Sequence, residues 1–151
     1  MRIELIDHRS PPIAAALSDL LRSSYRVEAD LIGFEGIPGL SASAASVAAS
    51  ILTWVGALKN DELVGAIAYE IIGETVDIDS LVVAPANFRS GIGRCLLHYV
   101  LATPGARRFI VGTGAANLPA VRLYESEGFQ TVERIDHPVA YIRFERLGTT
   151  T

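Results

Sequence analysis

The segment Leu81-Val-Val-Ala-Pro-Ala-Asn-Phe-Arg-Ser-Gly-Ile-Gly-Arg-Cys-Leu-Leu97 decides the fold and carries the first functional motif. Its apolar run ends at Pro85, a turn holds Gly91 and Gly93, and apolar residues then recur at helical spacing. The segment therefore predicts a strand, a glycine-rich turn and a helix. Because a helix start leaves backbone N–H groups without partners and carries partial positive charge, this turn can bind a phosphate group.

The glycine-rich turn admits two interpretations. Glycine allows a ligand close to the main chain, and Arg89 and Arg94 add positive charge nearby. Glycines also cap or bend chains where no ligand is involved, so the motif needs its context. A Rossmann motif requires a third glycine where this chain has Leu96, and a Walker loop requires Gly-Lys-Ser/Thr where it has Gly93-Arg94-Cys95. Both nucleotide-binding patterns are therefore incomplete.

A second segment, Asn117-Leu-Pro-Ala-Val-Arg-Leu-Tyr-Glu-Ser-Glu-Gly-Phe129, follows the apolar run of residues 109–112. The two segments together resemble the GNAT superfamily of acetyl-coenzyme A-dependent N-acetyltransferases. That signature joins a strand, a glycine-rich turn and a helix to a later Asn-x-x-Ala-x-x-Leu-Tyr-x-x-x-Gly-Phe pattern. The later pattern is filled at every position, by Asn117, Ala120, Leu123, Tyr124, Gly128 and Phe129. The usual turn, Arg/Gln-x-x-Gly-x-Gly/Ala, is altered in one place, because Phe88 stands three residues before Gly91 and the arginine follows as Arg89.

The order of the predicted elements indicates an α+β fold. Strands are expected at residues 2–7, 53–58, 63–72, 75–83, 107–112, 129–134 and 139–146, and helices at residues 11–25, after the glycine-rich turn, at 41–52 and at 119–127. The helix after the turn is a crossover, so the strands on either side of it run parallel. The resemblance implies three α/β/α layers and a mixed, mostly antiparallel sheet whose two central parallel strands splay apart. We expect one domain over residues 1–151.

The resemblance also implies acetyl-CoA as co-substrate. Its pyrophosphate would meet the main-chain N–H groups of the glycine-rich turn, and its pantetheine would bond to the strand before that turn. The coenzyme contacts expected in this way are Leu81, Val82, Val83, Phe88, Arg89, Ser90, Gly91, Ile92, Gly93, Arg94, Asn117 and Tyr124.

Tyr124 occupies the position at which the family's tyrosine approaches the coenzyme sulfur. A phenol with an ordinary pKa of about 10 keeps its proton at neutral pH and can donate it to a departing thiolate. A tyrosine packed between helix and sheet is the alternative. Asn117 can cap the helix that it opens and can also offer its amide to the coenzyme.

Asp79 is the predicted general base. Asp77 and Asp79 lie on one side of their strand if side chains alternate, and the family often has an acidic or imidazole residue at the Asp79 position. Asp79 could take the amine's proton through water, attract a cationic acceptor, or be a solvated carboxylate. Glu28, in a segment expected between two helices, and water are alternative bases. Aromatic residues that could line an acceptor pocket, or belong to the core instead, are Tyr25, Phe34, Trp54 and Tyr69.

Composition limits the remaining function classes. The single Cys95 cannot form an internal disulfide and is expected to pack inside, while His8, His98 and His137 show no ligand spacing, so no metal site is expected. A formal net charge of −4 argues against binding of nucleic acid through its phosphates. Since no uncharged run approaches the length of about 20 residues that spans a bilayer, we expect no membrane contact and a cytoplasmic protein.

These patterns favour an N-acetyltransferase that moves acetyl from acetyl-CoA directly to a primary amine, with no covalent enzyme intermediate. The acceptor is left open between a small-molecule amine and a peptide or protein amine. Rival interpretations are a non-catalytic acyl-CoA-binding sensor or regulatory module, and a plain interaction domain. A homodimer is also open, because the closing strands near Tyr141 and Phe144 are expected to be exposed and could pair.

Overall fold

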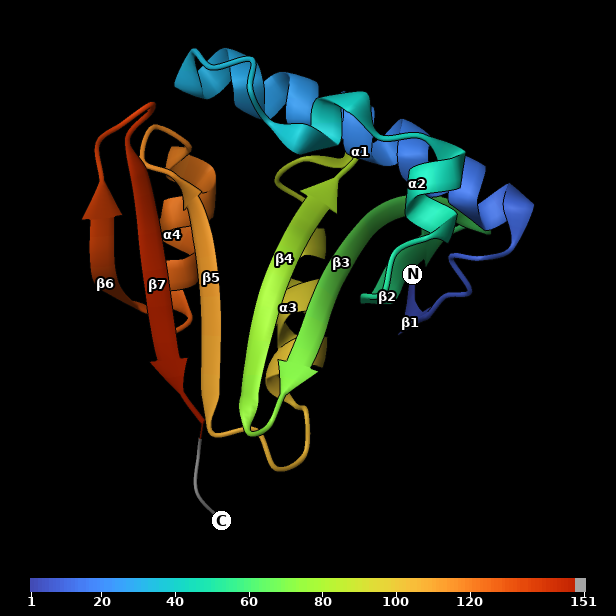
Figure 1. Ribbon diagram of the computed structural model, residues 1–151. Coiled ribbons are helices and arrows are strands. Elements are labelled where there is room, and N and C mark those ends of the chain that lie inside the picture. Colours follow the sequence, from blue (N-terminus) through green and yellow to red (C-terminus); the bar gives the residue numbers. More distant parts are fainter. Residues whose placement is uncertain (149–151) are drawn as a thin grey trace.

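The computed structural model describes residues 1–148 as one mixed sheet covered by helices on both faces (Figure 1). The strands are β1 (Arg2–Leu5), β2 (Thr53–Lys59), β3 (Glu62–Ile72), β4 (Thr75–Val83), β5 (Arg108–Gly114), β6 (Gln130–Ile135) and β7 (Tyr141–Leu147). The helices are α1 (Pro11–Ile32), α2 (Ala44–Ala48), α3 (Ile92–Leu101) and α4 (Leu118–Ser126), with short 3-10 turns η1 (Pro38–Ser41) and η2 (Pro85–Asn87). The α+β class and the crossover through α3 are confirmed.

The seven strands are ordered β1-β2-β3-β4-β5-β7-β6, and within residues 1–148 only the β4–β5 pair is parallel. That pairing is short, because it covers Thr75 to Asp77 of β4 against Arg108 to Ile110 of β5. Beyond it the two strands diverge toward α1 (Figure 1). The splayed parallel pair expected in the middle of the sheet is confirmed.

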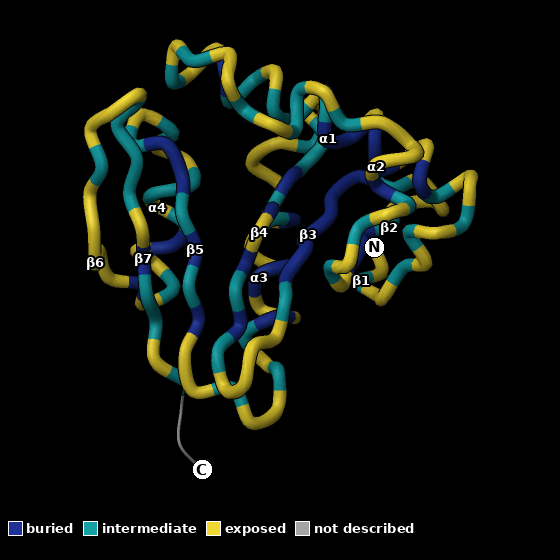
Figure 2. Tube along the Cα trace, viewed as in Figure 1, coloured by how far each residue is buried: buried dark blue, intermediate teal, exposed yellow. Residues whose placement is uncertain are grey.

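Two apolar cores lie on opposite faces of the sheet. One holds Leu96, Leu97, Phe109 and Phe144 beneath α3 and α4, and each of these side chains is at most 1% exposed. The other holds residues of α1 and α2 packed on β2, β3 and β4, among them Leu17, Leu20, Leu21, Val47, Trp54 and Val82. Figure 2 shows buried positions concentrated on the central strands and exposed positions along β6. The arrangement is therefore three-layered, as predicted.

Two helix boundaries differ from the prediction. The first helix continues past residue 25 to Ile32, because no proline or glycine interrupts it until Gly33, which ends it in the left-handed region at φ 67°. The helix expected at residues 41–52 is reduced to α2, which a capping box between Ser43 and Ser46 begins. The side chain of Ser50 bonds to the amide of Leu52 and so supports a bend after the helix.

The expectation that both closing strands form an exposed edge is wrong. The last strand, β7, inserts between β5 and β6, so β6 alone forms that edge. Phe144 is 1% exposed in the core, and Tyr141 is half-buried. No helix within residues 1–148 combines the length and apolarity needed to cross a membrane.

Candidate functional site

The start of α3 presents main-chain N–H groups that no helical carbonyl can accept. Gly91 is the N-cap at φ 80°, and the first intrahelical bond runs from the amide of Cys95 to the carbonyl of Gly91. Arg89 is also left-handed, at φ 62°, although it is not a glycine. Left-handed residues set among right-handed ones turn successive N–H groups inward and form an anion-binding concavity. Since a Cβ built on Gly91 would have nothing within 4 Å, the approach to these groups is open.

A cleft separates β4 from β5 beyond their short parallel pairing. The edge of β4 at residues 78–83 that faces β5 has no strand partner, so its backbone groups are free to bond a ligand. A cavity of about 580 Å³ opens there, lined by β4, β5, α4, β7 and the segment from α1 to α2. This volume is within the range of small-molecule sites.

Tyr124 projects into this cavity from α4. The residue is 4% exposed, and its ring packs edge-on against Phe129 with centroids 5.6 Å apart and lies tilted against Phe144 at 5.8 Å. Burial raises the pKa of Tyr124 well above its ordinary value, and the charges of Tyr25 and Glu28 add to the rise. The phenol is therefore protonated at any pH near neutral.

The N-cap of α4 fixes the direction of that helix. The side-chain oxygen of Asn117 accepts the amide of Ala120 at 3.4 Å, and Pro119 occupies the first turn. Asn117 therefore performs the capping role expected from the sequence, and it also lines the cavity.

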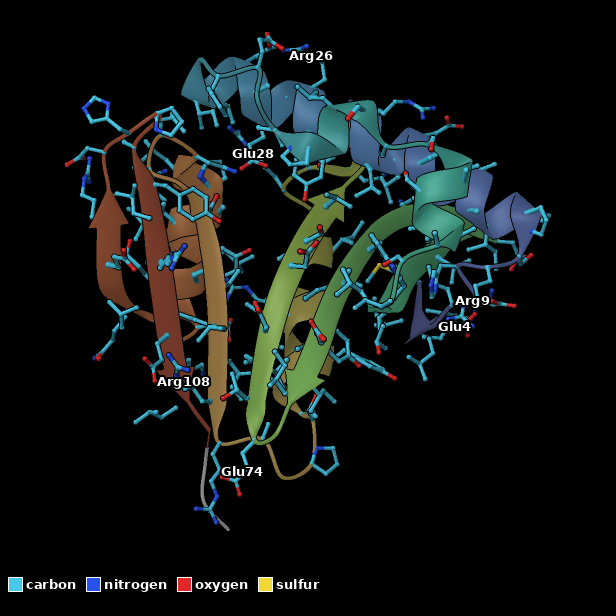
Figure 3. All side chains as sticks on the ribbon, in the orientation of Figure 1. Glu4, Arg9, Arg26, Glu28, Glu74 and Arg108 are labelled. Atoms are coloured by element: carbon cyan, nitrogen blue, oxygen red, sulfur yellow. The ribbon has the colours of Figure 1, made fainter. Side chains whose placement is uncertain are left out.

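Glu28 reaches the cavity from the side that α1 covers. It lies on α1 and not between two helices as expected, and Figure 3 shows it pointing toward the gap between β4 and β5 while Arg26 points away. Its carboxylate accepts the hydroxyl of Thr113, on β5, at 3.5 Å. Burial raises the pKa of Glu28, and hydrogen bonds from Asn117 and Thr113 oppose the rise in part. A raised carboxyl pKa makes this group a better proton acceptor than an exposed one.

Asp79 lies at an irregularity of β4. Ser80 is opposite Ala68 and Ile78 is opposite Tyr69, so Asp79 is the extra residue of a bulge. Asp77 and Asp79 were predicted to lie on one side of the strand because side chains alternate, and the bulge interrupts this alternation. Asp79 is exposed, lines the cavity, and accepts the hydroxyl of Ser80 at 2.8 Å.

The segment that covers the cavity is tied to α1 by arginines. Arg22 donates to the carbonyl of Ala42 at 2.6 Å, and Arg26 donates to Glu35 at 2.6 Å. Gly39 lies flat against Tyr25, because a Cβ there would be 1.9 Å from Cδ2 of the ring. The segment that covers the cavity is therefore packed on Tyr25, whose phenol lines the cavity from α1.

The profile of the acetyltransferase (GNAT) family matches residues 15–129 of this sequence. The chain belongs to this family. The match includes both the turn before α3 and the Asn117 to Phe129 segment, which are the two motifs that carry the resemblance in the sequence.

Solved GNAT structures have the same fold. The ribosomal-protein-S18-alanine N-acetyltransferase from Escherichia coli superposes with a TM-score of 0.79 at 15% identity, covering 99% of this chain and 95% of that chain. An aminoglycoside 6'-acetyltransferase type Ii gives 0.79 at 24% identity, with 100% and 99% covered. The PaiA N-acetyltransferase from Thermoplasma acidophilum, solved with coenzyme A, gives 0.76 at 19% identity, with 95% and 98% covered.

A curated relative shares more sequence. The UPF0157 protein YqkA of Bacillus subtilis is 38% identical over 134 residues, which are 88% of this chain. The chain spans only 39% of that relative's length.

The fold brings the expected catalytic residues and one of the three expected pantetheine contacts to one cavity, while Val82 is buried in the core and Val83 does not line the cavity. Tyr124, Asn117, Asp79 and Leu81 all line the cavity. Arg94 has a different partner, because its side chain pairs with Glu127 at the end of α4, and His98 bonds to the same carboxylate at 2.8 Å. The guanidinium of Arg94 is therefore engaged by Glu127, while its main-chain N–H group precedes the first intrahelical bond, which Cys95 donates.

Three of the four aromatic candidates line the cavity, namely Tyr25, Phe34 and Trp54. Tyr69 faces the core beneath α3 instead. The expected burial of Cys95 is wrong, since the residue is exposed. Its neighbours Leu96 and Leu97 belong to the buried stripe of α3, whereas position 95 turns to the outer side of the helix.

Tyr141 and Thr113 line the cavity but were not recognised in the sequence. The hydroxyl of Tyr141 lies over Gly112, where a Cβ would be only 2.3 Å from it. In the β5–β7 pairing Tyr141 is opposite Gly114, and its ring reaches diagonally across to Gly112. These two glycines beside a tyrosine are a signal that is readable only when the order of the strands is known. Burial raises the pKa of Tyr141, and the charge of Glu28 adds to this effect.

Proposed function

We propose that this protein is an acetyl-CoA-dependent N-acetyltransferase, a single domain over residues 1–151 that moves acetyl directly to a primary amine. One juxtaposition supports the proposal: the start of α3, with its free amides, lies against α4, which carries the buried phenol of Tyr124. A Cβ on Gly93, in the first turn of α3, would be 3.6 Å from Cδ2 of Leu123, the residue before Tyr124. The anion-binding turn and the proton donor are therefore held by two helices in direct contact.

The residues present fit the co-substrate. The diphosphate would bind the inward N–H groups of the turn, and the pantetheine amides would bond to the free edge of β4. The proposed coenzyme contacts are Leu81, Val82, Val83, Phe88, Arg89, Ser90, Gly91, Ile92, Gly93, Arg94, Asn117 and Tyr124. When bound, acetyl-CoA supplies a thioester carbonyl open to attack by an amine and a thiolate leaving group.

Tyr124 is the proposed general acid. Its raised pKa keeps the proton on the phenol until negative charge develops on the departing sulfur. The amine nitrogen forms the new bond to the acyl carbon as the carbon–sulfur bond breaks. Tyr124 gives its proton to the departing sulfur while a base takes one proton from the amine, and transfer of that proton from the base to the phenolate restores both groups before the next turnover.

We propose that the carboxylate of Glu28 accepts the proton that the amine loses. The sequence predicted Asp79 for this role, with Glu28 and water as alternatives. Glu28 has a pKa raised by burial and is among the groups that perturb the pKa of Tyr124. Asp79 is exposed, is not among those groups, and already accepts a hydroxyl from Ser80. Glu28 therefore fits the role of a base at the reaction centre better than Asp79 does.

The proposal is tested by release of free thiol from acetyl-CoA in the presence of primary amines. Tyr124→Phe is expected to lower kcat at least tenfold while calorimetry finds coenzyme binding unchanged. Tyr99→Phe is the matched control, because Tyr99 is 37% exposed on α3 and does not line the cavity. Coenzyme binding without thiol release would instead support the non-catalytic acyl-CoA-binding module.

The identity of the base is tested by pH–rate profiles. Activity should fall as pH drops through the raised pKa of Glu28, because the protonated carboxyl can no longer accept a proton. Glu28→Gln should lower the plateau and remove this acidic limb, whereas Asp79→Asn should retain it. An acidic limb that disappears only in Asp79→Asn would return the role to Asp79.

A further inference from the structure

The charged side chains that line the cavity are all acidic. Among the described lining residues, Glu28 and Asp79 carry carboxylates, and no lysine, arginine or histidine accompanies them. Glu28 comes from α1 and Asp79 from β4, so the two groups approach from different walls. Such a cavity has a negative potential that attracts cations and repels anions.

Two phenols lie within range of both carboxylates. Burial raises the pKa of Tyr25 and of Tyr141, and in each case the charges of Glu28 and Asp79 raise it further. The charge of Arg143, which does not line the cavity, lowers the pKa of Tyr141 in part, and a hydrogen bond with Ser80 lowers that of Tyr25. Glu28 lies on the β5 side of the cavity, where its carboxylate accepts the hydroxyl of Thr113, and Asp79 lies on the β4 side, where its carboxylate accepts the hydroxyl of Ser80.

The hydroxyl of Tyr124 independently indicates a ligand between these groups. Every fully enclosed side-chain polar atom in residues 1–148 has a hydrogen-bond partner. Tyr124 is 4% exposed, and its hydroxyl has no hydrogen-bond partner among residues 1–148. The hydroxyl oxygen is therefore not fully enclosed, and it is accessible through the cavity that Tyr124 lines. A nearly buried polar group without a protein partner is available to a bound molecule.

We propose, on the basis of the acetyl transfer proposed above, that the acceptor is a small amine with a second cationic nitrogen and no carboxylate. The reacting nitrogen lies by Tyr124 and Glu28, and the second ammonium group pairs with Asp79. The class includes diamines, polyamines and amino sugars with two or more amino groups.

The protonation state needed for attack favours a second nitrogen. An amine must be neutral to attack, so the reacting nitrogen cannot also neutralise Asp79. Asp79 is exposed in the free protein and accepts the hydroxyl of Ser80, and when the acceptor displaces water from the cavity, a second ammonium group can replace the solvation that this carboxylate loses. A carboxylate on the acceptor would meet two like charges and no basic side chain, which disfavours amino acids.

A series of amines with one carbon chain tests this inference. Acetyl-CoA-dependent thiol release is measured with 1,4-diaminobutane, 1-aminobutane and 4-aminobutanoate, which share the reacting group and differ in charge at the far end. We expect kcat/KM for the diamine to exceed that for the monoamine at least tenfold, and that for the amino acid to be lower still. A monoamine or amino acid used as well as the diamine would overturn the inference.

Asp79→Asn provides the residue-level test. The ratio of kcat/KM for diamine to that for monoamine should fall toward one, through a higher KM for the diamine. Asp77→Asn is the matched control for loss of a negative charge on β4, because the charge of Asp77 also reaches Tyr141 but its side chain does not line the cavity. An equal loss with both substrates in Asp79→Asn, or an unchanged ratio, would overturn the role of Asp79.

Calorimetry separates this inference from the proposed activity. Binding of 1,4-diaminobutane to the coenzyme A complex should be at least tenfold tighter than binding of 1-aminobutane, and Asp79→Asn should abolish the difference. Coenzyme and diamine binding without thiol release would refute acetyl transfer yet retain a diamine site. Thiol release with 1-aminobutane but no preferential diamine binding would refute the diamine site alone.

Discussion

The left-handed turn before α3 leads to opposite predictions for two glycines that lie two residues apart. Gly91 has φ 80°, and a Cβ there would meet nothing within 4 Å, so Gly91→Ala is strained only through its backbone. Left-handed φ costs an ordinary residue roughly 1–2 kcal/mol. Because alanine also reduces the entropy of the unfolded chain, we expect a net loss of about 1 kcal/mol.

Gly93 lies inside the helix, where alanine is preferred over glycine. A Cβ there would be 3.6 Å from Leu123 and 3.8 Å from Val83, both ordinary contacts. Gly93→Ala should therefore stabilise the fold by about 0.5–1 kcal/mol through helix propensity. The two variants should differ by about 2 kcal/mol in the free energy of unfolding, or by roughly 4–8 °C in Tm for a chain of this size.

Urea and thermal unfolding followed by circular dichroism measure this difference directly. Gly91→Asn is the matched control, because asparagine tolerates the left-handed region and should lose less stability than alanine. Equal stability of Gly91→Ala and Gly93→Ala would show that the turn is not left-handed at Gly91. The inward orientation of the N–H groups, on which coenzyme binding depends, would then be refuted.

Three further predictions concern residues around the two helices that flank the cleft. Cys95 is exposed, so a thiol reagent should label one equivalent in the folded protein, and labelling only after denaturation would contradict its position. Burial opposes ionisation of Glu127, but hydrogen bonds and charges of His98 and Arg94 outweigh it and lower the pKa. The stability advantage of the wild type over Glu127→Gln should therefore be present at neutral pH and shrink below about pH 4, as denaturation at both pH values would show. Asn117→Ala should cost about 0.5–2 kcal/mol of unfolding free energy while Asn117→Asp retains the cap, and equal losses would argue against capping.

Most of the fold was predictable because its signals are local. Apolar alternation located the strands, and the glycine-rich turn followed by a helical stripe fixed the crossover that makes β4 and β5 parallel. The place of β7 could not be predicted, because the sequence orders strands along the chain and not across the sheet. The length of α1 was underestimated although Arg26, Glu28, Ala29 and Leu31 all favour a helix, and its end is set by Gly33.

Some residues of the candidate site could be predicted from the sequence and others could not. Tyr124 and Asn117 lie on a contiguous motif, so their positions could be predicted by pattern alone. Glu28 and Thr113 are far apart in the sequence, and the 3.5 Å contact between them exists only because α1 crosses the open end of the cleft. The bulge at Asp79 was equally hidden, since it depends on the register of β4 against β3.

The sheet opens at β4 and β5 without losing its integrity because the face beneath the cleft is closed. The core that contains Leu96 of α3 and Phe144 of β7 is continuous across both halves of the sheet. Glu127 joins those halves again at the surface, through Arg94 and His98. Since these contacts fix the two halves of the sheet relative to each other before any ligand arrives, binding need not reorganise the backbone, and less of the binding free energy is lost to ordering. The same rigidity fixes Tyr124 relative to the turn that would bind the diphosphate, which is the geometry that direct transfer between two bound reactants requires.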